Sequence, residues 1–139
     1  MAPAWLPATN QLEEQADLLQ KISQCADHSK PGLLHGAILL EAEADSWLVR
    51  LEARDKRGLR LEAEDLELEI YGSAQNPSIQ IGWLLDSDQP LLWLGRHPVW
   101  MDPNTGMQLE RPEAGINLET LGRRLRTLLS NVTSPALSP

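Results

Sequence analysis

Residues 10–29 carry the first periodic pattern of apolar and polar positions in the chain. Asn10 with Glu13 three residues later is a capping-box pattern, which is typical of a helix start. Lys30-Pro31-Gly32 ends the pattern, because proline disfavours helical geometry at the preceding residue. The apolar positions share one helical stripe, since they recur at spacings of seven, three and four: Leu12, Leu19, Ile22 and Ala26. The pattern predicts an amphipathic helix over 10–29.

After this helix the apolar positions recur every second residue, which predicts strands with one buried face. Strands are predicted over 37–44, 47–54 and 59–63, the last two joined by a hairpin turn at 55–58. From Leu66 the alternation resumes with the opposite parity. A continuous strand cannot do this, because a one-residue slip reverses every side chain. A bulge or break near Glu64-Asp65 is therefore expected, and a helix over 59–71 is the alternative, since Leu and Glu also favour helices.

The second half of the chain predicts further strands and a closing helix. The strands lie at 79–85, 91–94, 99–101 and 107–109, and the continuous apolar run 91–94 predicts a strand covered on both faces. The helix spans 118–130, with Asn117 as its cap and Glu119 paired with Arg123 one turn later. Its apolar stripe consists of Leu118, Leu121, Leu125, Leu128 and Leu129.

These elements predict an α+β fold: an N-terminal helix, an antiparallel meander of about six or seven strands, and a C-terminal helix. The sheet is expected to be curved or to close partly into a barrel. The length of 139 residues is typical of one domain. We therefore expect a single domain over 1–139, with 1–9 and 130–139 as flexible tails.

Charge narrows the choice of partners. The chain has 20 acidic and 12 basic residues, a net charge of −8, and the acids dominate everywhere before residue 120. Such a molecule repels nucleic acid at long range, so we expect a protein partner, preferably a cationic one, and no nucleic acid. The one basic cluster contains Arg123, Arg124 and Arg126. It is interpreted as cations at a helix C-terminus, with contact to an anion or an acidic partner as the alternative.

The size, the acidity and the helix–sheet–helix order resemble those of small acidic secretion chaperones. The helix that such chaperones carry between their strand groups is missing here, and no residue role is transferred. No apolar run approaches the length of a membrane helix, and the first residues lack the pattern of a secretory signal. With a single cysteine, which fits a reducing compartment, these features predict a cytoplasmic protein without membrane contact.

No metal or cofactor is expected. The segment from Asp102 to Glu113 has the length of a calcium loop, but Met107 occupies the sixth position, where the turn needs glycine. Asp86 and Asp88 add carboxylates without completing a ligand set. Another group, Cys25, His28 and His35, lacks a fourth ligand for a soft metal.

Catalysis is not expected either, because no nucleophile motif and no phosphate-binding glycine loop is present. An enzyme that uses Asp86 or Asp88 with His97 is kept as the last alternative. Glutamates are frequent, but on alternating strands we expect them on a solvated sheet face: Glu41, Glu43, Glu62, Glu64, Glu67 and Glu69.

The composition includes five tryptophans and no phenylalanine. Trp47 and Trp83 are in phase with apolar strand faces, which predicts core positions. Trp93 and Trp100 flank Gly95-Arg96-His97-Pro98, where a stacking surface and plain burial both remain open.

Residues 91–107 are therefore predicted to carry the functional surface. The candidate binding residues are Trp93, Arg96, His97, Trp100, Met101 and Met107. The predicted function is a non-catalytic protein-interaction module, an adaptor or dedicated chaperone that binds a protein partner or self-associates as a homodimer. The alternative is a curved sheet or barrel that holds a small ligand against the tryptophans. An open sheet with an apolar patch would favour the partner, and a closed sheet with an interior pocket would favour the ligand.

Overall fold

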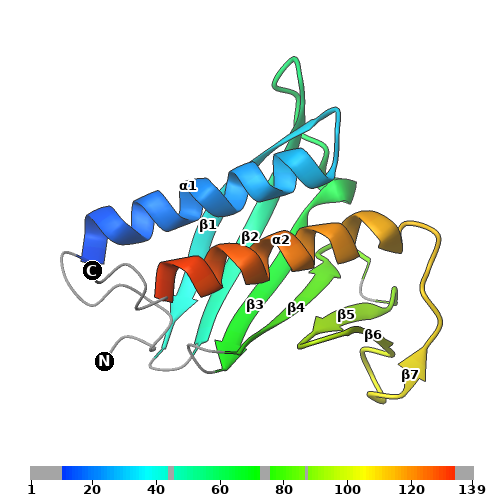
Figure 1. Ribbon diagram of the computed structural model, residues 1–139. Helices are drawn as coiled ribbons and strands as arrows, with labels where there is room; N and C mark the ends of the chain where they lie inside the picture. Colours follow the sequence, from blue (N-terminus) through cyan, green and yellow to red (C-terminus); the bar gives the residue numbers. More distant parts are fainter. Residues whose placement is uncertain (1–10, 44–45, 73–75, 87, 134–139) are drawn as a thin grey trace.

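The computed structural model describes residues 11–43, 46–72, 76–86 and 88–133 (Figure 1). Along the chain, one long helix precedes seven strands and a second long helix follows them. The elements are α1 (Gln11–Ser29), β1 (Leu33–Ala42), β2 (Ser46–Asp55), the short 3₁₀ helix η1 (Glu62–Glu64), β3 (Leu66–Gly72), β4 (Pro77–Trp83), β5 (Leu91–Leu94), β6 (Pro98–Met101), β7 (Gln108–Leu109) and α2 (Gly115–Thr133).

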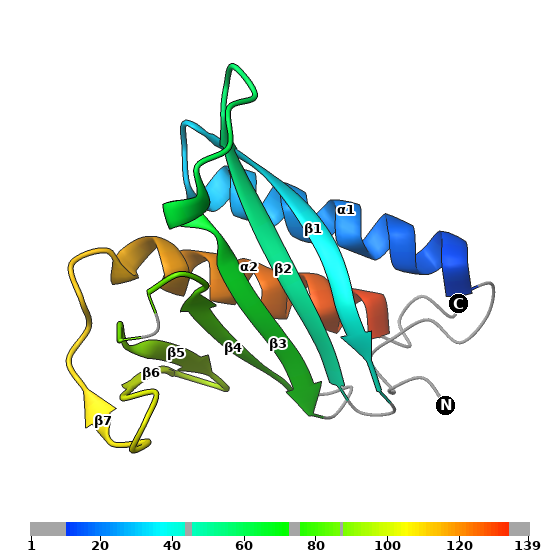
Figure 2. The ribbon, with the colours of Figure 1, turned by 180° about the vertical axis from the view of Figure 1, so that it is seen from behind.

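The strands form one antiparallel sheet in which each strand pairs with its neighbours in the sequence, from β1 to β7. The sheet is open, since β1 and β7 are its two edges. Both helices lie on the same face, α1 along β1 and α2 over β4 and β5 (Figure 1). Figure 2 shows the other face, which no described helix covers. The predicted α+β fold is confirmed, as a curved open sheet rather than a barrel.

The core fills the space between the two helices and the sheet. Ile22 of α1 and Leu121 of α2 are fully buried against alternate residues of the central strands. Trp47 is also fully buried, as predicted. Trp83 shares this face but is half-buried at the end of β4, where its ring stacks on that of Trp100 with centroids 6.4 Å apart.

The strand predicted over 59–63 is wrong, and so is the helix over 59–71 beyond the single turn of η1. A loop follows β2 and is held to it by an isolated bridge between Arg54 and Arg60, with backbone hydrogen bonds from the Asp55 N–H to Leu59 and from the Leu61 N–H to Ala53. Polar contacts to Asp65 set the path of this loop. The Asp65 carboxylate is almost fully buried and accepts a hydrogen bond from the backbone N–H of Ala53 at 2.8 Å. It also accepts hydrogen bonds from both terminal nitrogens of the Arg60 guanidinium, at 2.9 and 2.6 Å. The predicted break near Glu64-Asp65 is confirmed.

Several predicted boundaries also shift. β1 begins at Leu33, four residues before the predicted start. α2 begins at Gly115, so Asn117 lies inside the helix and is not its cap. α2 continues to Thr133, so 130–133 are helical and the arginine cluster lies mid-helix rather than at a C-terminus. β5 is buried on alternate residues only, Leu92 and Leu94, and is not covered on both faces.

Some expectations concern parts of the chain that are not described. The predicted tail 1–9, the capping residue Asn10 and residues 134–139 lie outside the described residues, as do the side chains of Leu12 and Glu13. Within the described ranges, neither helix is long and apolar enough to cross a membrane.

Candidate interaction surface

The face of the sheet opposite the helices carries two rows of side chains that cross β3, β4, β5 and β6. Opposed residues of neighbouring antiparallel strands point to the same face, which defines the rows. One row contains Glu69, Gln80, Trp93 and Val99. The other contains Glu67, Gly82, Leu91 and Met101. We call these eight residues the open-face patch. It changes from acidic on β3 to apolar on β5 and β6.

Trp93 is fixed in the centre of the apolar half of this patch. Its Nε1 donates a hydrogen bond to Tyr71 Oη at 2.5 Å, and Gln80 Nε2 donates to the same oxygen at 3.4 Å. The indole lies over Gly95, where any side chain would collide with it. Leu91 lies over Gly82 in the same way. The apolar side chains are therefore positioned on the sheet before any partner arrives, and they remain half-buried rather than covered.

A pocket of about 250 Å³ adjoins the acidic half of the patch. The patch residues Gln80, Gly82 and Leu91 contribute to its wall. Three carboxylates line it and no lysine or arginine does: Glu67, Glu69 and Asp86. Arg50 stands opposite Glu67 on β2 but does not line the pocket. The arrangement places negative charge directly beside exposed apolar surface, which suits a cationic group carried on an apolar segment.

The structure separates the six residues predicted for the functional surface. Trp93 and Met101 belong to the open-face patch, and Arg96 and His97 are exposed in the turn between β5 and β6. Met107 is 67% exposed and immediately precedes β7. Trp100 points to the helical face, is only 4% exposed, and donates from Nε1 to Glu119 Oε2 at 2.7 Å. Of the two interpretations of Trp100, a stacking surface and burial, the structure shows burial.

Sequence reasoning missed the residues that orient Trp93. Tyr71 and Gln80 lie on β3 and β4, and nothing in the local sequence links them to a tryptophan on β5. One signal was present: a glycine inside a strand pattern often marks a close approach by another group, as Gly82 does for Leu91. The glutamates of β3 are exposed on the sheet face, as predicted.

A known protein family matches most of the chain. Residues 19–128 match the family described as "Domain of unknown function (DUF8659)". The chain belongs to this family. The matched segment runs from α1 to α2 and includes all seven strands, hence the whole open-face patch. No curated protein and no solved structure matches the chain significantly.

The residues considered for catalysis are not brought together. Asp86 and Asp88 are exposed in the loop before β5, and His97 follows the far end of that strand. A four-residue strand spans about 13 Å. β5 therefore lies between the two carboxylates and this imidazole, with the acids before one end of the strand and the histidine after the other.

Nor do the residues considered for metal binding gather. Among the described residues, no group of three or more His, Cys, Asp or Glu side chains could hold an ion. The Asp102 carboxylate accepts the backbone N–H groups of Asn104 at 2.7 Å and Thr105 at 3.1 Å. These bonds lie within the loop that begins at Asp102, so the carboxylate stabilises the local backbone.

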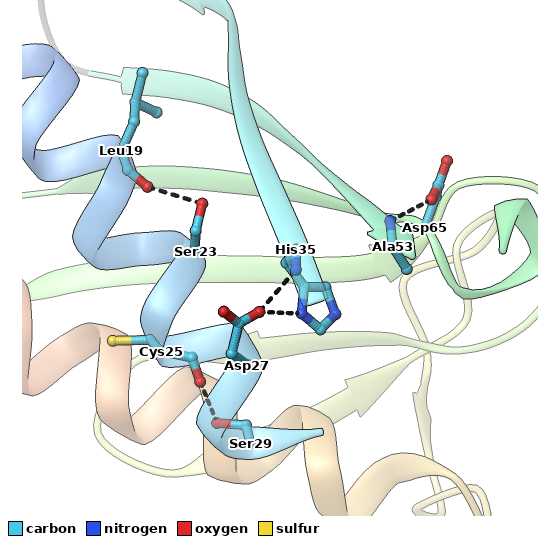
Figure 3. A network of polar contacts seen from close by, with 8 residues as sticks. All are labelled: Leu19, Ser23, Cys25, Asp27, Ser29, His35, Ala53 and Asp65. Carbon is cyan, nitrogen blue, oxygen red and sulfur yellow. Dashed lines mark hydrogen bonds and ion pairs between the residues drawn. The ribbon is translucent and has the colours of Figure 1, made fainter. Parts of the chain in front are cut away.

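Cys25 and His35 have different surroundings (Figure 3). His35 is buried, and Asp27 Oδ1 lies 2.9 Å from its Nδ1 and accepts its backbone N–H at 2.7 Å. Cys25 and His28 line a groove between α1 and α2. Burial raises the pKa of the Cys25 thiol, and the nearby positive charge of Arg124 partly opposes this. The thiol is therefore held protonated at neutral pH, a poor state for a nucleophile or metal ligand.

Proposed function

We propose that this chain is a non-catalytic protein-interaction module, of the adaptor or dedicated chaperone type, whose open-face patch binds a segment of a partner protein. The observation that carries the proposal is an open sheet with one uncovered face on which four apolar side chains remain partly exposed: Leu91, Trp93, Val99 and Met101. Exposed apolar groups with a polar rim are typical of interaction sites, and tryptophan is enriched among the residues that dominate binding energy.

The electrostatics favour a partner segment that combines basic and apolar side chains. The pocket beside the patch is lined by Glu67, Glu69 and Asp86, and the whole chain carries a charge of −8. A lysine or arginine can enter the pocket while neighbouring apolar residues pack on Trp93, whose ring face also attracts cations. The same field disfavours nucleic acid.

A small ligand is supported less well than a protein segment. The sheet is open and does not close around an interior cavity, so it does not enclose a ligand against the tryptophans as a barrel would. We include a cytoplasmic location in the proposal, supported by the single cysteine, whose thiol is reduced in such a compartment.

A peptide array tests the proposal directly. It would present segments that combine aromatic or aliphatic residues with Lys and Arg, and matched segments in which Asp and Glu replace the bases. We expect the wild-type chain to retain the basic set. Trp93→Ala should weaken binding of the best peptide by about 30-fold, the equivalent of a hot spot of about 2 kcal/mol. Fluorescence anisotropy measures the change.

Leu59→Ala is the matched control, because Leu59 is an exposed apolar residue in the loop after β2, outside the open-face patch. It should bind like the wild type. Met101→Lys, which puts a positive charge on the apolar half, should bind as weakly as Trp93→Ala. Equal retention of acidic and basic segments, or full binding by both patch variants, would refute the proposal. Circular dichroism of each variant checks that it remains folded.

A further inference from the structure

The two edges of the sheet differ in how they are protected against pairing with another strand. At one edge β7 has only two residues and is followed by the charged pair Glu110 and Arg111. At the other edge β1 has ten residues, and its first eight contain no lysine, arginine, aspartate, glutamate or proline. Short strands, charges and prolines are the usual protection of an edge, and a long apolar edge without them tends to pair.

The register shows which backbone groups of β1 point outward. Ala53 lies opposite His35 in the register. Its N–H donates to Asp65 Oδ1 and its C=O accepts the N–H of Leu61, both on the side away from β1. Bonded and non-bonded pairs alternate along an antiparallel ladder. His35 therefore directs its backbone groups away from β2, and so do Ala37 and Leu39 at spacings of two.

Part of this edge is already occupied. The N–H of His35 is bonded to the Asp27 carboxylate at the end of α1 (Figure 3). Beyond it, no described strand pairs with the outer side of β1. A register shift between Leu39 and Glu41 then disturbs the strand. The regular, free part of the edge is therefore centred on Ala37, Ile38 and Leu39.

The side chains along this edge are apolar and exposed. Leu34, Ile38 and Leu40 are 46%, 42% and 39% exposed. Two copies that each carry a charge of −8 repel one another, so a contact between them is least costly where both surfaces lack charge. Residues 36–40, beyond the Asp27 carboxylate at His35, provide such a surface.

We propose that β1 pairs antiparallel with β1 of a second copy of this chain, which joins two seven-stranded sheets into one. With the two-fold axis at Ile38, Ala37 and Leu39 exchange backbone hydrogen bonds with Leu39 and Ala37 of the other copy. The two Ile38 side chains then meet on the open face as a non-hydrogen-bonded pair. The contact lies at the edge opposite β7 and does not depend on the proposed function of the open-face patch.

Analytical ultracentrifugation over a concentration series tests the pairing. The wild-type chain should form a dimer, and Ile38→Lys should weaken dimerisation by about 30-fold or more, because two like charges then meet in a desolvated contact. Leu59→Lys is the matched control, since it places the same charge at an exposed leucine (62%) outside the sheet. It should leave the dimer intact.

A cross-link provides a second, positive test. Non-hydrogen-bonded antiparallel partners have Cα atoms about 4.5 Å apart, within the range of a disulfide. Ile38→Cys in a Cys25→Ser background should therefore form covalent dimers under mild oxidation, and Leu59→Cys in the same background should not.

Three results would overturn the proposal. They are a wild-type chain that stays monomeric, a dimer that Ile38→Lys leaves unchanged, and a β1 edge that binds a different protein while the chain alone remains monomeric. Trp93→Ala and Met101→Lys should not change the dimer. Failure of this proposal is thus distinguishable from failure of the open-face patch.

Discussion

At the scale of single residues, Trp93 and Trp100 lie on the same pair of strands but on opposite faces of the sheet. They are seven positions apart, and the hairpin turns one to the open face and the other to the core. Trp100 donates to the buried Glu119 carboxylate, which also lies 3.5 Å from Arg111 and 3.6 Å from Arg123. One indole therefore ties β6 to α2, and the other is available for contact.

Trp100→Ala should destabilise the fold by about 3–5 kcal/mol, because it removes a large buried ring and leaves a cavity. Trp100→Phe should be milder, since a ring can still stack on Trp83 while the Glu119 carboxylate loses its indole donor, at a cost of about 1–3 kcal/mol. Urea unfolding followed by circular dichroism measures both. A Trp100→Ala chain as stable as the wild type would contradict the core assignment.

At the scale of elements, the connection between β2 and β3 depends on one carboxylate. The side-chain hydrogen bond from Arg60 lowers the pKa of Asp65, burial opposes this, and the bond from the Ala53 N–H lowers it further. Asp65 also accepts, through its backbone C=O, the N–H of Leu84 at 3.0 Å. The loop after β2, η1 and the end of β4 thus meet at this residue.

Asp65→Asn should lower the melting temperature at pH 7 by on the order of 5 °C. The folded pKa of Asp65 lies below its unfolded value of about 3.9, so the ionised carboxylate stabilises the fold above about pH 4. This stabilisation is lost as the pH falls from there through the lowered folded pKa, so the difference between variant and wild type should shrink toward pH 3. Glu110→Gln, at an exposed carboxylate that does not act on Arg60, is the control. A pH-independent difference would mean that the charge of Asp65 is not what stabilises the loop.

The elements that sequence alone predicted are those whose contacts follow a period. Both helices and the alternation of β2 were found because a buried stripe or face repeats along the chain. Residues 59–63 were misread because Leu59 and Leu61 alternate like a strand, whereas the Arg60–Asp65 pair decides the path. Trp93 and Met101 were found by type, but the carboxylates beside them come from β3 and the β4–β5 loop. Only the register brings these groups together.

At the scale of the whole molecule, the charge of −8 acts on the two proposed contacts in opposite directions. Along the β1 edge, two equally charged copies meet through an uncharged strand, so their net repulsion opposes association. At the open-face patch, the carboxylates of Glu67, Glu69 and Asp86 attract a basic segment, so charge promotes association. Ionic strength therefore separates the two contacts without any substitution.

Raising the salt concentration from about 0.1 M to about 1 M shortens the Debye length from about 10 Å to about 3 Å. The screening should strengthen dimerisation, because repulsion between the copies falls while the apolar contact of Ile38 remains. The same change should weaken binding of the basic peptide, because its attraction to the pocket carboxylates is screened. Sedimentation and anisotropy on one protein preparation measure the two trends. If peptide binding does not weaken with salt, carboxylate attraction does not drive it, and if dimerisation weakens, the copies meet through paired charges rather than through β1.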